Sequence, residues 1–529
     1  MRVSGERRQH SGCAAVLAML TAFGCSSSGS SGKGGSGGAR VTGAGGAKSA
    51  GGAGGSNGLA GAGGATAGGS AGAGVGGTTA NGGRDGLGGT AGHGEGGVSA
   101  AGGGAGATAR GGAGGMAGQG AGGGAGSPGQ GGGGATAASA CRGAVHSAAP
   151  AAAAIPKPAL TVPAGFTLEA IGQISQAREL VALPNGDLLV ATNGPSTFLI
   201  PNADAATGPG TPIMFTAPEE SGAQGIAFDA SSCTIYLSSQ HNIYAVAYRD
   251  GQQSATTGAP IATVRNGSVS PNRPPADTDE HKTTSVAVAG GALYAGVGSS
   301  CNACVETDPT RATVQKMELT GAHMSTRATR LRNAIALIEN PATGTLWAGG
   351  AGQDSLAAKH PFEFFDAVSS HAGIADYGWP DCEENHVAYT PNVTCAGTVA
   401  PLIELPAYST IIGAAFYPTN PGGPYAFPAS YRGGLFLTTH GSWHQNPNGT
   451  NAAAAQVVFV PMNGDAPAIP VDWSDPTKQW TAFVSGFEAS EGITRIGRPT
   501  GIAVGPLGSL FVADDYFSGY ILRIRPGTN

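Results

Sequence analysis

The sequence has few charged and few aromatic residues, and it has no long apolar run beyond its first 25 residues. Charged side chains make up 11% and aromatic side chains 6% of the 529 residues. No other segment approaches the roughly 20 consecutive apolar residues that a transmembrane helix needs, so no membrane-spanning helix is expected. Helical periodicity is also scarce, which argues against a mainly helical fold.

The shortage of side chains that can form a core is greatest in the first quarter of the chain. Residues 1–140 hold 54 of the 94 glycines and almost no aromatic or branched apolar side chains. Such a segment cannot bury enough apolar surface to offset its ordering entropy. The composition therefore predicts a flexible, disordered Gly/Ala/Ser-rich linker over residues 26–145. Any GxGxxG match within it is an accident of composition.

The first 25 residues have the pattern of an export signal. Three arginines precede an apolar core, Cys13 to Gly24, that is too short to span a bilayer. The following Ala22-Phe23-Gly24-Cys25 resembles a bacterial lipobox, in which the cysteine is lipidated and becomes the mature N-terminus. We expect an exported bacterial protein, either an outer-membrane lipoprotein or a protein of the cell surface or periplasm, whose only membrane contact is a lipid anchor on Cys25.

The charge balance excludes two classes of partner for the remainder of the chain. The whole sequence has a net charge of −6, while residues 1–140 contain eight basic and three acidic side chains, or +5. The remaining residues therefore carry −6 − 5 = −11. An acidic module is a poor partner for nucleic acid or for an anionic membrane.

Cysteine is also scarce, and export to an oxidising compartment would make disulfides the expected state of the cysteines. If Cys13 is removed and Cys25 is lipidated, an even six remain: Cys141, Cys233, Cys301, Cys304, Cys382 and Cys395. In an oxidising compartment, disulfides are the default for an even set. The CxxC of Cys301 and Cys304 has no second CxxC to complete a four-thiolate zinc site.

Six segments share one pattern, a short β-prone run, a turn rich in Pro, Asn, Gly or Asp, and a second run. They begin at Arg178, Gln224, Thr284, Arg332, Ile412 and Thr500. Each reads as an antiparallel hairpin. Six hairpins spaced roughly 45 to 90 residues apart predict an all-β fold, a six-bladed β-propeller over residues 150–529. A large β-sandwich and a propeller of seven or eight blades are the alternatives.

A polar cluster precedes the third hairpin, at a position from which side chains can reach the mouth of a propeller channel. It consists of Asp277, Asp279, Glu280 and His281. A histidine can act as a general base near neutral pH, and neighbouring carboxylates would raise its basicity. The alternative is an exposed acidic loop with an incidental histidine.

Arg332 and Asn333 open the fourth hairpin. The guanidinium is a planar fork suited to carboxylate or quinone oxygens, and the amide is both a donor and an acceptor. A salt bridge at the end of a blade is the alternative role.

Two further loop motifs place aromatic residues beside glycine. They are DYGWP, which contains Trp379, and HGSWH, which begins at His440. They can line a pocket or simply pack in loops. His440 and His444 have i, i+4 spacing, but they lack helical context and an acidic partner in the sequence, so zinc is not expected there.

These motifs occur in one order along the chain. They are VPAGF (from Val162), His281, VGSSCNAC (from Val297), LRN (from Leu331), DYGWPDC (from Asp376), FPASYRGGLFLTTHGSW (from Phe427) and GRPTGIAVGPLGSLFVADD (from Gly497). On them, the region from Val162 to Pro526 resembles the glucose/sorbosone dehydrogenase family of six-bladed quinoproteins, in particular its sorbosone-dehydrogenase-like branch.

The resemblance implies that pyrroloquinoline quinone (PQQ) and Ca²⁺ lie at the channel and that a sugar is oxidised by base-assisted hydride transfer to the quinone. Carried over residue by residue, His281 is the base and Arg332 the group beside the quinone oxygens. The implied cofactor-binding residues are Asn333, Arg498, Trp379 and His440. The implied calcium ligands are backbone carbonyls of Gly352 and Gln353, which suit a hard cation.

The resemblance also supports a disulfide between Cys301 and Cys304. The next pair is Cys382 with Cys395, which leaves Cys141 to join Cys233. The expected substrate is an aldose, a sorbosone-like aldehyde or a sugar alcohol, while the electron acceptor is unknown.

Some positions near the implied cofactor depart from the family pattern. Ala334 replaces a usual proline, Gly350 and Ala351 replace an acidic residue and an amide, and His444-Gln445 stands where a basic residue is common. The segment around Glu363 keeps one carboxylate. A second hypothesis is therefore a non-catalytic tethered propeller that binds carbohydrate or protein. A metal-dependent lactone hydrolase is a third, less favoured because acidic side chains facing the channel are sparse in the motifs.

Overall fold

The structure is a computed structural model. It describes residues 141, 155–156, 158–205, 208–218, 220, 224–266, 281–282, 284–356, 359–441, 444–516 and 519–527. The signal, Cys25, most of the proposed linker, and Asp277, Asp279 and Glu280 lie outside these residues, so the domain boundaries proposed above remain predictions. All described residues belong to the second of the two units into which the chain divides, Ala121–Asn529.

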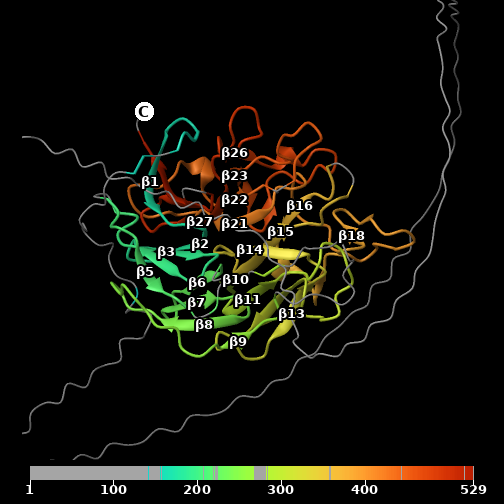
Figure 1. Ribbon diagram of the computed structural model, residues 1–529, viewed down its shortest axis with the longest axis horizontal. Coiled ribbons are helices and arrows are strands. Elements are labelled where there is room, and N and C mark those ends of the chain that lie inside the picture. Colours follow the sequence, from blue (N-terminus) through green and yellow to red (C-terminus); the bar gives the residue numbers. More distant parts are fainter. Residues whose placement is uncertain are drawn as a thin grey trace, which may run out of the picture. The chain divides into compact units, whose positions relative to one another are not determined.

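The described residues form six antiparallel blades around a common centre (Figure 1). Blade one contains β2 (Ala177–Ala182), β3 (Leu188–Thr192), β4 (Thr197–Ile200) and β5 (Ile213–Thr216). Blade two contains β6 (Ile226–Asp229), β7 (Thr234–Ser238), β8 (Asn242–Ala247) and β9 (Ala262–Thr263). Blade three contains β10 (Ser285–Ala289), β11 (Ala292–Val297), β12 (Thr313–Met317) and β13 (Ser325–Thr329), with β17 (Ala375–Asp376) added in parallel to β13.

The other three blades follow the same order from the centre outwards. Blade four contains β14 (Asn333–Asn340), β15 (Thr345–Ala351), β16 (Glu363–Asp366) and β20 (Ile403–Leu405). Blade five contains β21 (Ile411–Phe416), β22 (Leu435–Thr439), β23 (Gln456–Val460) and β26 (Thr481–Val484). Blade six contains β27 (Pro499–Val504), β28 (Leu510–Asp514), β29 (Tyr520–Pro526) and, from the other end of the domain, β1 (Phe166–Gln173).

Short elements occupy the connections. Two small hairpins are β18 (Cys382–Glu383) with β19 (Val387–Ala388), and β24 (Met462–Asn463) with β25 (Ala466–Pro467). Single 3₁₀ turns span Val368–Ser370, Ala429–Tyr431 and Pro476–Gln479. In the part of the chain that is described, no helix is long and apolar enough to cross a membrane.

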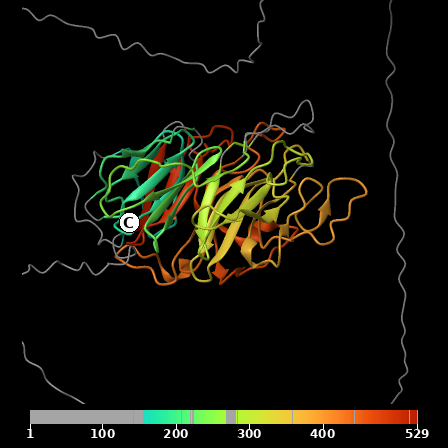
Figure 2. The ribbon, with the colours of Figure 1, turned by 90° about the horizontal axis from the view of Figure 1, so that it is seen from below.

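The six predicted hairpins are the two innermost strands of the six blades. The first strands β2, β6, β10, β14, β21 and β27 contact their neighbours in succession, and β2 meets β27 to close the ring. Figure 2, seen at 90° to Figure 1, shows the strands running from one face of the propeller to the other. The prediction of an all-β, six-bladed propeller is confirmed.

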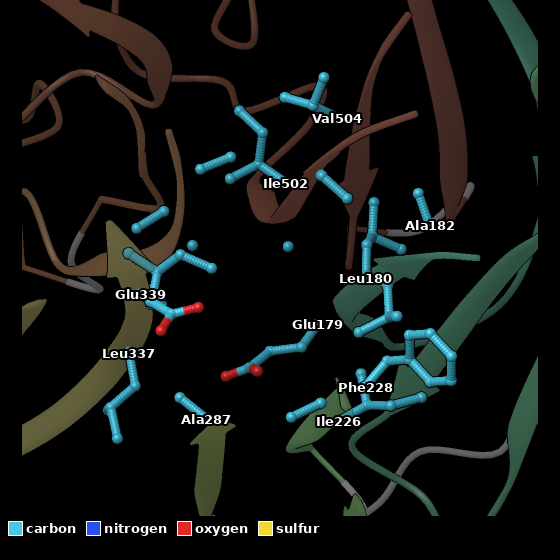
Figure 3. Close-up of a pocket in the computed structure, with 18 of the residues that line it drawn as sticks. Glu179, Leu180, Ala182, Ile226, Phe228, Ala287, Leu337, Glu339, Ile502 and Val504 are labelled. Carbon is cyan, nitrogen blue, oxygen red and sulfur yellow. The ribbon is translucent and has the colours of Figure 1, made fainter. Parts of the chain in front are cut away.

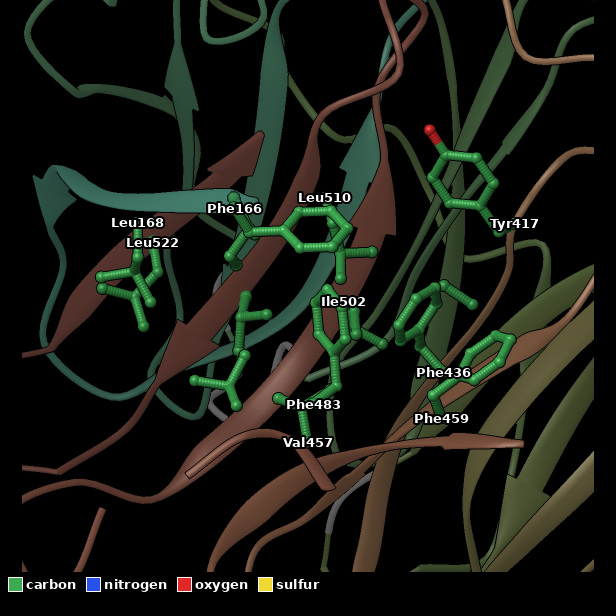
Figure 4. Close-up of a cluster of buried hydrophobic side chains, with 14 of the residues drawn as sticks. Phe166, Leu168, Tyr417, Phe436, Val457, Phe459, Phe483, Ile502, Leu510 and Leu522 are labelled. Carbon is green, nitrogen blue, oxygen red and sulfur yellow. The ribbon is translucent and has the colours of Figure 1, made fainter. Parts of the chain in front are cut away.

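The ring is held together by apolar layers between adjacent blades. The largest described cluster packs β1 and blade six against blade five. In it, Phe166 of β1 has its ring centroid 4.6 Å from that of Phe427 and 5.2 Å from that of Phe483 (Figure 4). The first strand thus closes the last blade through both backbone pairing with β29 and aromatic packing.

Candidate functional site

The antiparallel blades bring the sequence-predicted residues to one face. In each blade the first strand begins, and the second ends, on the same face of the propeller. His281, Arg332 and Arg498 lie at or just before the start of first strands, and His440 and Gly352 follow second strands. The candidate residues therefore surround one end of the ring of inner strands.

The imidazole of His281 is oriented by the backbone at the end of β11. Its Nδ1 lies 3.0 Å from both the carbonyl oxygen and the Oγ of Ser299. A carbonyl oxygen can only accept, so Nδ1 carries the proton and donates it. Nε2 is then the basic nitrogen of the neutral ring.

The same surroundings keep this imidazole neutral. Burial, followed by the positive charge of Arg332, lowers the pKa of His281 to about 3. The carboxylates at Asp277, Asp279 and Glu280 lie outside the described residues. The expectation that those carboxylates raise the basicity of His281 therefore stays a prediction, while among the described residues desolvation and a nearby cation both disfavour the charged ring.

Arg332 lies beside His281 and is 5% exposed. Its Nε donates to the carbonyl of Asn302 at 3.1 Å, and its Nη2 donates to Asn302 Oδ1 and Asp354 Oδ2, both at 3.0 Å. Its own carbonyl accepts from the amide of Ser299 at 2.7 Å. The guanidinium is therefore fixed in one orientation.

Gly298 allows His281 and Asn333 to approach each other. A Cβ placed on Gly298 would lie 2.3 Å from the Cβ of His281 and 2.7 Å from Asn333 Oδ1. No side chain fits there without displacing both residues. The structure thus joins His281, Arg332 and Asn333 in one cluster.

His440 and Arg498 belong to a second polar cluster. Arg498 Nη2 donates to His440 Nδ1 at 2.7 Å, and His440 Nε2 lies 2.9 Å from Asp515 Oδ1. Asp515 also pairs with Arg178 at 3.2 Å. Because guanidinium only donates, the proton of the neutral His440 ring is on Nε2 and points to Asp515.

This second cluster contains two guanidinium cations and one carboxylate around a neutral imidazole. Burial lowers the pKa of His440 to about 3 despite the neighbouring carboxylate. Burial also acts to raise the pKa of Asp515, but the interaction with His440, including its hydrogen bond, and the charges of Arg178 and Arg498 outweigh burial and lower that pKa to about 2. Burial lowers the pKa of Arg498 to about 10, so it remains a cation.

The expectation that His440 and His444 lack acidic partners is wrong. His440 pairs with Asp515, while His444 Nε2 lies 3.2 Å from Asp354 Oδ1. The two acids come from distant parts of the sequence, which the spacing of the histidines does not reveal. The separate partners also place the two rings in different contacts rather than in a shared zinc site.

Gly352 and Gln353 follow β15, above two buried carboxyl groups. The amide of Gly352 donates to Glu363 Oε2 at 3.1 Å, and the amide of Gln353 faces Glu383. Burial raises the pKa of each of these glutamates to about 8. Since C=O and N–H point in opposite directions across a trans peptide, the Gly352 carbonyl points away from Glu383.

Gly350 is required by close strand packing. It pairs with Ala334 across β14 and β15, and a Cβ at this position would lie 1.9 Å from the carbonyl oxygen of Asn333. An acidic side chain cannot be placed there in this backbone. The glycine at position 350, where the family usually has an acidic residue, is therefore required by the close packing of β15 against β14 beside Asn333.

Trp379 packs against the CxxC loop rather than lining an open surface. It is 3% exposed, clusters with Cys301 and Cys304, and donates from Nε1 to the carbonyl of Asn302 at 3.0 Å. The three predicted disulfides are all formed: Cys141–Cys233, Cys301–Cys304 and Cys382–Cys395.

Among the described residues, one set of three potential metal ligands comes together, Cys301, Cys304 and Glu306. Its two sulfurs are bonded to each other. A disulfide offers no thiolate to a metal, so this cluster is a structural link and not a zinc site.

The channel itself contains an apolar cavity of about 340 Å³. It is lined by all six inner strands and by Pro341 and Pro418, which follow the ends of β14 and β21 at the opposite face. Figure 3 shows Glu179 among the residues that line it. Glu179 is its most deeply buried carboxyl, 9% exposed, and Oε1 finds no hydrogen-bond partner in the described part of the chain. The cavity is thus separate from the polar clusters at the other face.

Sequence reasoning missed three residues that organise the site: Asn302, Asp354 and Asp515. Asn302 lies inside the CNAC motif, Asp515 ends the terminal VADD, and Asp354 directly follows the Gly352-Gln353 pair. Their residue types are visible in the sequence, but their partners come from other blades.

Comparison with known proteins finds similar folds among solved structures but no match by sequence. No protein-family profile and no curated protein matches the chain. Solved structures do match: the holo form of the PQQ domain of pyranose dehydrogenase from Coprinopsis cinerea has a TM-score of 0.55 at 18% identity, covering 70% of this chain and 98% of that one. The chain has the fold of that domain.

A calcium structure of a Carbohydrate-Active Enzymes Family AA12 protein from Trichoderma reesei gives the same values, a TM-score of 0.55, 18% identity, and coverage of 70% and 98%. The shared fold spans nearly the whole of both solved chains, and at this identity it establishes architecture. The chemistry has to be argued from the residues of this chain.

Proposed function

We propose that this protein is an exported, PQQ-dependent dehydrogenase that oxidises a sugar. The observation that carries the proposal is the neutral His281 imidazole, fixed by Ser299 with Nε2 as its basic nitrogen, beside the buried cation Arg332. The fold shared with a PQQ domain of a pyranose dehydrogenase supports it.

In this proposal His281 Nε2 takes the proton of the substrate hydroxyl. The Ser299 carbonyl, which already accepts from Nδ1–H, stabilises the positive charge that the ring then acquires. Arg332 supplies fixed positive charge beside the reacting groups, and its three described hydrogen bonds prevent its reorientation. The quinone, when bound, supplies the acceptor for the hydride.

The residues of this face fit such a cofactor. An anionic quinone needs cations, and Arg332, Arg498 and Arg178 lie on this face. A hard divalent cation needs oxygen ligands, which the carbonyls of Gly352 and Gln353 would provide. Beneath them, Glu383 Oε1 is buried without a described hydrogen-bond partner, and a cation nearby would favour the ionised form of Glu383 and Glu363, which burial disfavours.

The decisive experiment titrates the purified full-length chain with PQQ in the presence of CaCl₂. We expect a quinone absorbance change, a higher melting temperature, and reduction of an artificial electron acceptor with at least one member of a panel of aldoses, sugar aldehydes and sugar alcohols. His281→Ala should lower kcat by about 10²–10⁴-fold, the range that a general base contributes.

His323→Ala is the matched control, because that histidine is exposed and pairs only with Glu318 among the described residues. Failure of PQQ to bind, together with no turnover of any sugar, would contradict the proposal and favour the alternative of a non-catalytic propeller that binds carbohydrate or protein. Full activity in His281→Ala would refute the assigned base.

A further inference from the structure

The CNAC sequence forms a short loop between the two residues to which the proposed function assigns the chemistry. It follows β11 directly and is closed by the Cys301–Cys304 disulfide, with both cysteines buried. Asn302 lies between them. A loop of this length has few conformations once its ends are joined.

Asn302 organises the Arg332 side of the site through both of its oxygen atoms. Its carbonyl accepts from Arg332 Nε and from Trp379 Nε1, at 3.1 and 3.0 Å. Its Oδ1 accepts from Arg332 Nη2 at 3.0 Å and from the amide of Asp354 at 2.7 Å. Its Nδ2 donates to the Asp354 carbonyl at 3.0 Å. One side chain therefore places both members of the Arg332–Asp354 ion pair.

The same loop reaches His281 from the other side. Ser299 Oγ donates to the carbonyl of Cys301 at 2.7 Å, so its remaining lone pairs can accept from His281 Nδ1. The position of the Cys301 carbonyl thus sets the orientation of the hydroxyl that contacts the imidazole. Both assigned residues depend on a loop that one disulfide closes.

We propose that the Cys301–Cys304 loop is a thiol-sensitive positioning element, in which Asn302 aligns Arg332 and Asp354 and the Cys301 carbonyl aligns Ser299 against His281. A dithiol can open it: its two S–H groups give two electrons and two protons, the S–S bond breaks, Cys301 and Cys304 become thiols, and the dithiol becomes a cyclic disulfide. The inference concerns regulation of the proposed active site and rests on the proposed function.

Global stability is expected to depend little on this link. In the chain-entropy account a disulfide stabilises more when it closes a longer loop. Cys301 and Cys304 are 3 residues apart, whereas Cys141 and Cys233 are 92 apart. Loss of the first pair should therefore affect the site more than the melting temperature, and loss of the second should do the reverse.

The test uses the full-length chain with two variants, Asn302→Ala and the double variant Cys301→Ala/Cys304→Ala. With PQQ, CaCl₂ and the best sugar, each should lower kcat at least 10-fold with less than a threefold change in KM. Asn340→Ala is the control, since Asn340 is a buried asparagine whose side chain also donates hydrogen bonds but lies at the far end of β14. Cys141→Ala/Cys233→Ala is the control for losing a disulfide.

A second readout does not require activity. In ¹⁵N-histidine-labelled protein, the His281 ring should show the Nδ1–H tautomer and no titration between pH 5 and 8 in the parent chain. In the Cys301/Cys304 variant, and after treatment of the parent with dithiothreitol, the ring should exchange between tautomers or titrate within that range. The Cys141/Cys233 variant should retain the parent spectrum.

The two failures are distinguishable. A parent chain that neither binds PQQ nor turns over refutes the proposed function, while the histidine spectra still test the loop. Unchanged His281 spectra in both loop variants would overturn the positioning role even if the parent is inactive, and with an active parent an unchanged kcat in both variants would overturn it as well.

Discussion

At the scale of residues, the site depends on hydrogen-bonding side chains and backbone groups that hold its histidines and arginines in fixed orientations. Ser299 sets the tautomer of His281, Asn302 holds Arg332, and Asp515 accepts from His440. Each polar atom named has a partner with ordinary geometry, so the imidazoles are neutral and oriented before any ligand arrives. Preorganisation of this kind lowers the cost of reaching a reactive arrangement.

The low pKa of His281 gives the first prediction, which rests on the proposed function. A general base with a pKa of about 3 is already unprotonated throughout the range from pH 5 to 8. We therefore expect kcat/KM for the sugar to lack an acidic limb in this range. The measurement is a pH–rate profile with saturating PQQ and Ca²⁺, and loss of activity with a midpoint near 6.5 would contradict the described environment of His281.

Gly350 gives the second prediction. Gly350→Ala places a Cβ 1.9 Å from the Asn333 carbonyl oxygen, so β14 and β15 have to separate where Arg332 and Asn333 emerge. We expect a loss of about 3 kcal/mol in the free energy of unfolding, measured with urea. Gly258→Ala is the control, because that position is exposed and a Cβ there meets no atom within 4 Å. Equal stability of both variants would show that the strands tolerate the added methyl group.

At the scale of elements, the first strand of the domain completes the last blade. β1 pairs along its length with β29, so the ring is closed by residues from opposite ends of the described fold. With β1 in place the sixth sheet has four strands, as do blades one, two, four and five. The C-terminal blade, which supplies Arg498 and Asp515, is therefore complete only when β1 is docked.

Phe166 gives the third prediction, because it anchors β1 against Phe427 and Phe483. Phe166→Ala removes a ring that is 5% exposed, which costs about 3–5 kcal/mol in a packed core. We expect the urea midpoint to fall while unfolding stays a single transition. Met214→Ala, at a 59% exposed position on the outer strand β5, should change the midpoint little. A similar midpoint for Phe166→Ala and the parent would mean that β1 does not secure the ring.

At the scale of the whole molecule, six inner strands enclose an apolar channel that contains the buried carboxyl of Glu179. No single blade creates this environment, since the lining comes from all six. Burial raises the pKa of Glu179 well above its usual range, even though a hydrogen bond from Ser285 favours the charged form. The assembled ring therefore holds a proton that the unfolded chain releases.

This proton gives the fourth prediction. Above the unfolded pKa of about 4.5, the native state binds more protons than the unfolded state, so stability falls as pH rises, by up to about 1.4 kcal/mol per pH unit. The amide in Glu179→Gln does not ionise, so the free energy of unfolding of this variant relative to that of the parent should increase from pH 5 to pH 8. Urea midpoints at several pH values measure the difference.

Glu491→Gln, at an exposed position, controls for the substitution itself. A constant difference between Glu179→Gln and the parent across this pH range would show that Glu179 ionises in the folded protein as it does in the unfolded chain. Such a result would also imply that water or an ion reaches the channel.

Much of the architecture was predictable because it depends on the local order of apolar and turn residues along the chain. The six hairpins alternate apolar runs with turn residues, and each became the inner half of a blade. The outer strands were not predicted individually, since β9 and β17 have two residues each and form by pairing with a neighbour. In the site, His281, Arg332 and Asn333 came from motifs, whereas Asn302 and Asp354 became recognisable only through contacts between blades three and four.

The sequence by itself determined the hairpins, their number, the supply of cysteines and the identities of the candidate base and cation, because these depend on residues close together in the chain. Only the tertiary structure decided which groups meet. It paired Asp515 with His440 across 75 positions and brought Asn302 to Arg332 across 30. It also partly desolvated His281 and placed it beside Arg332, which lowers its pKa, since desolvation and the position of a neighbouring charge are properties of the folded ring and not of the local sequence.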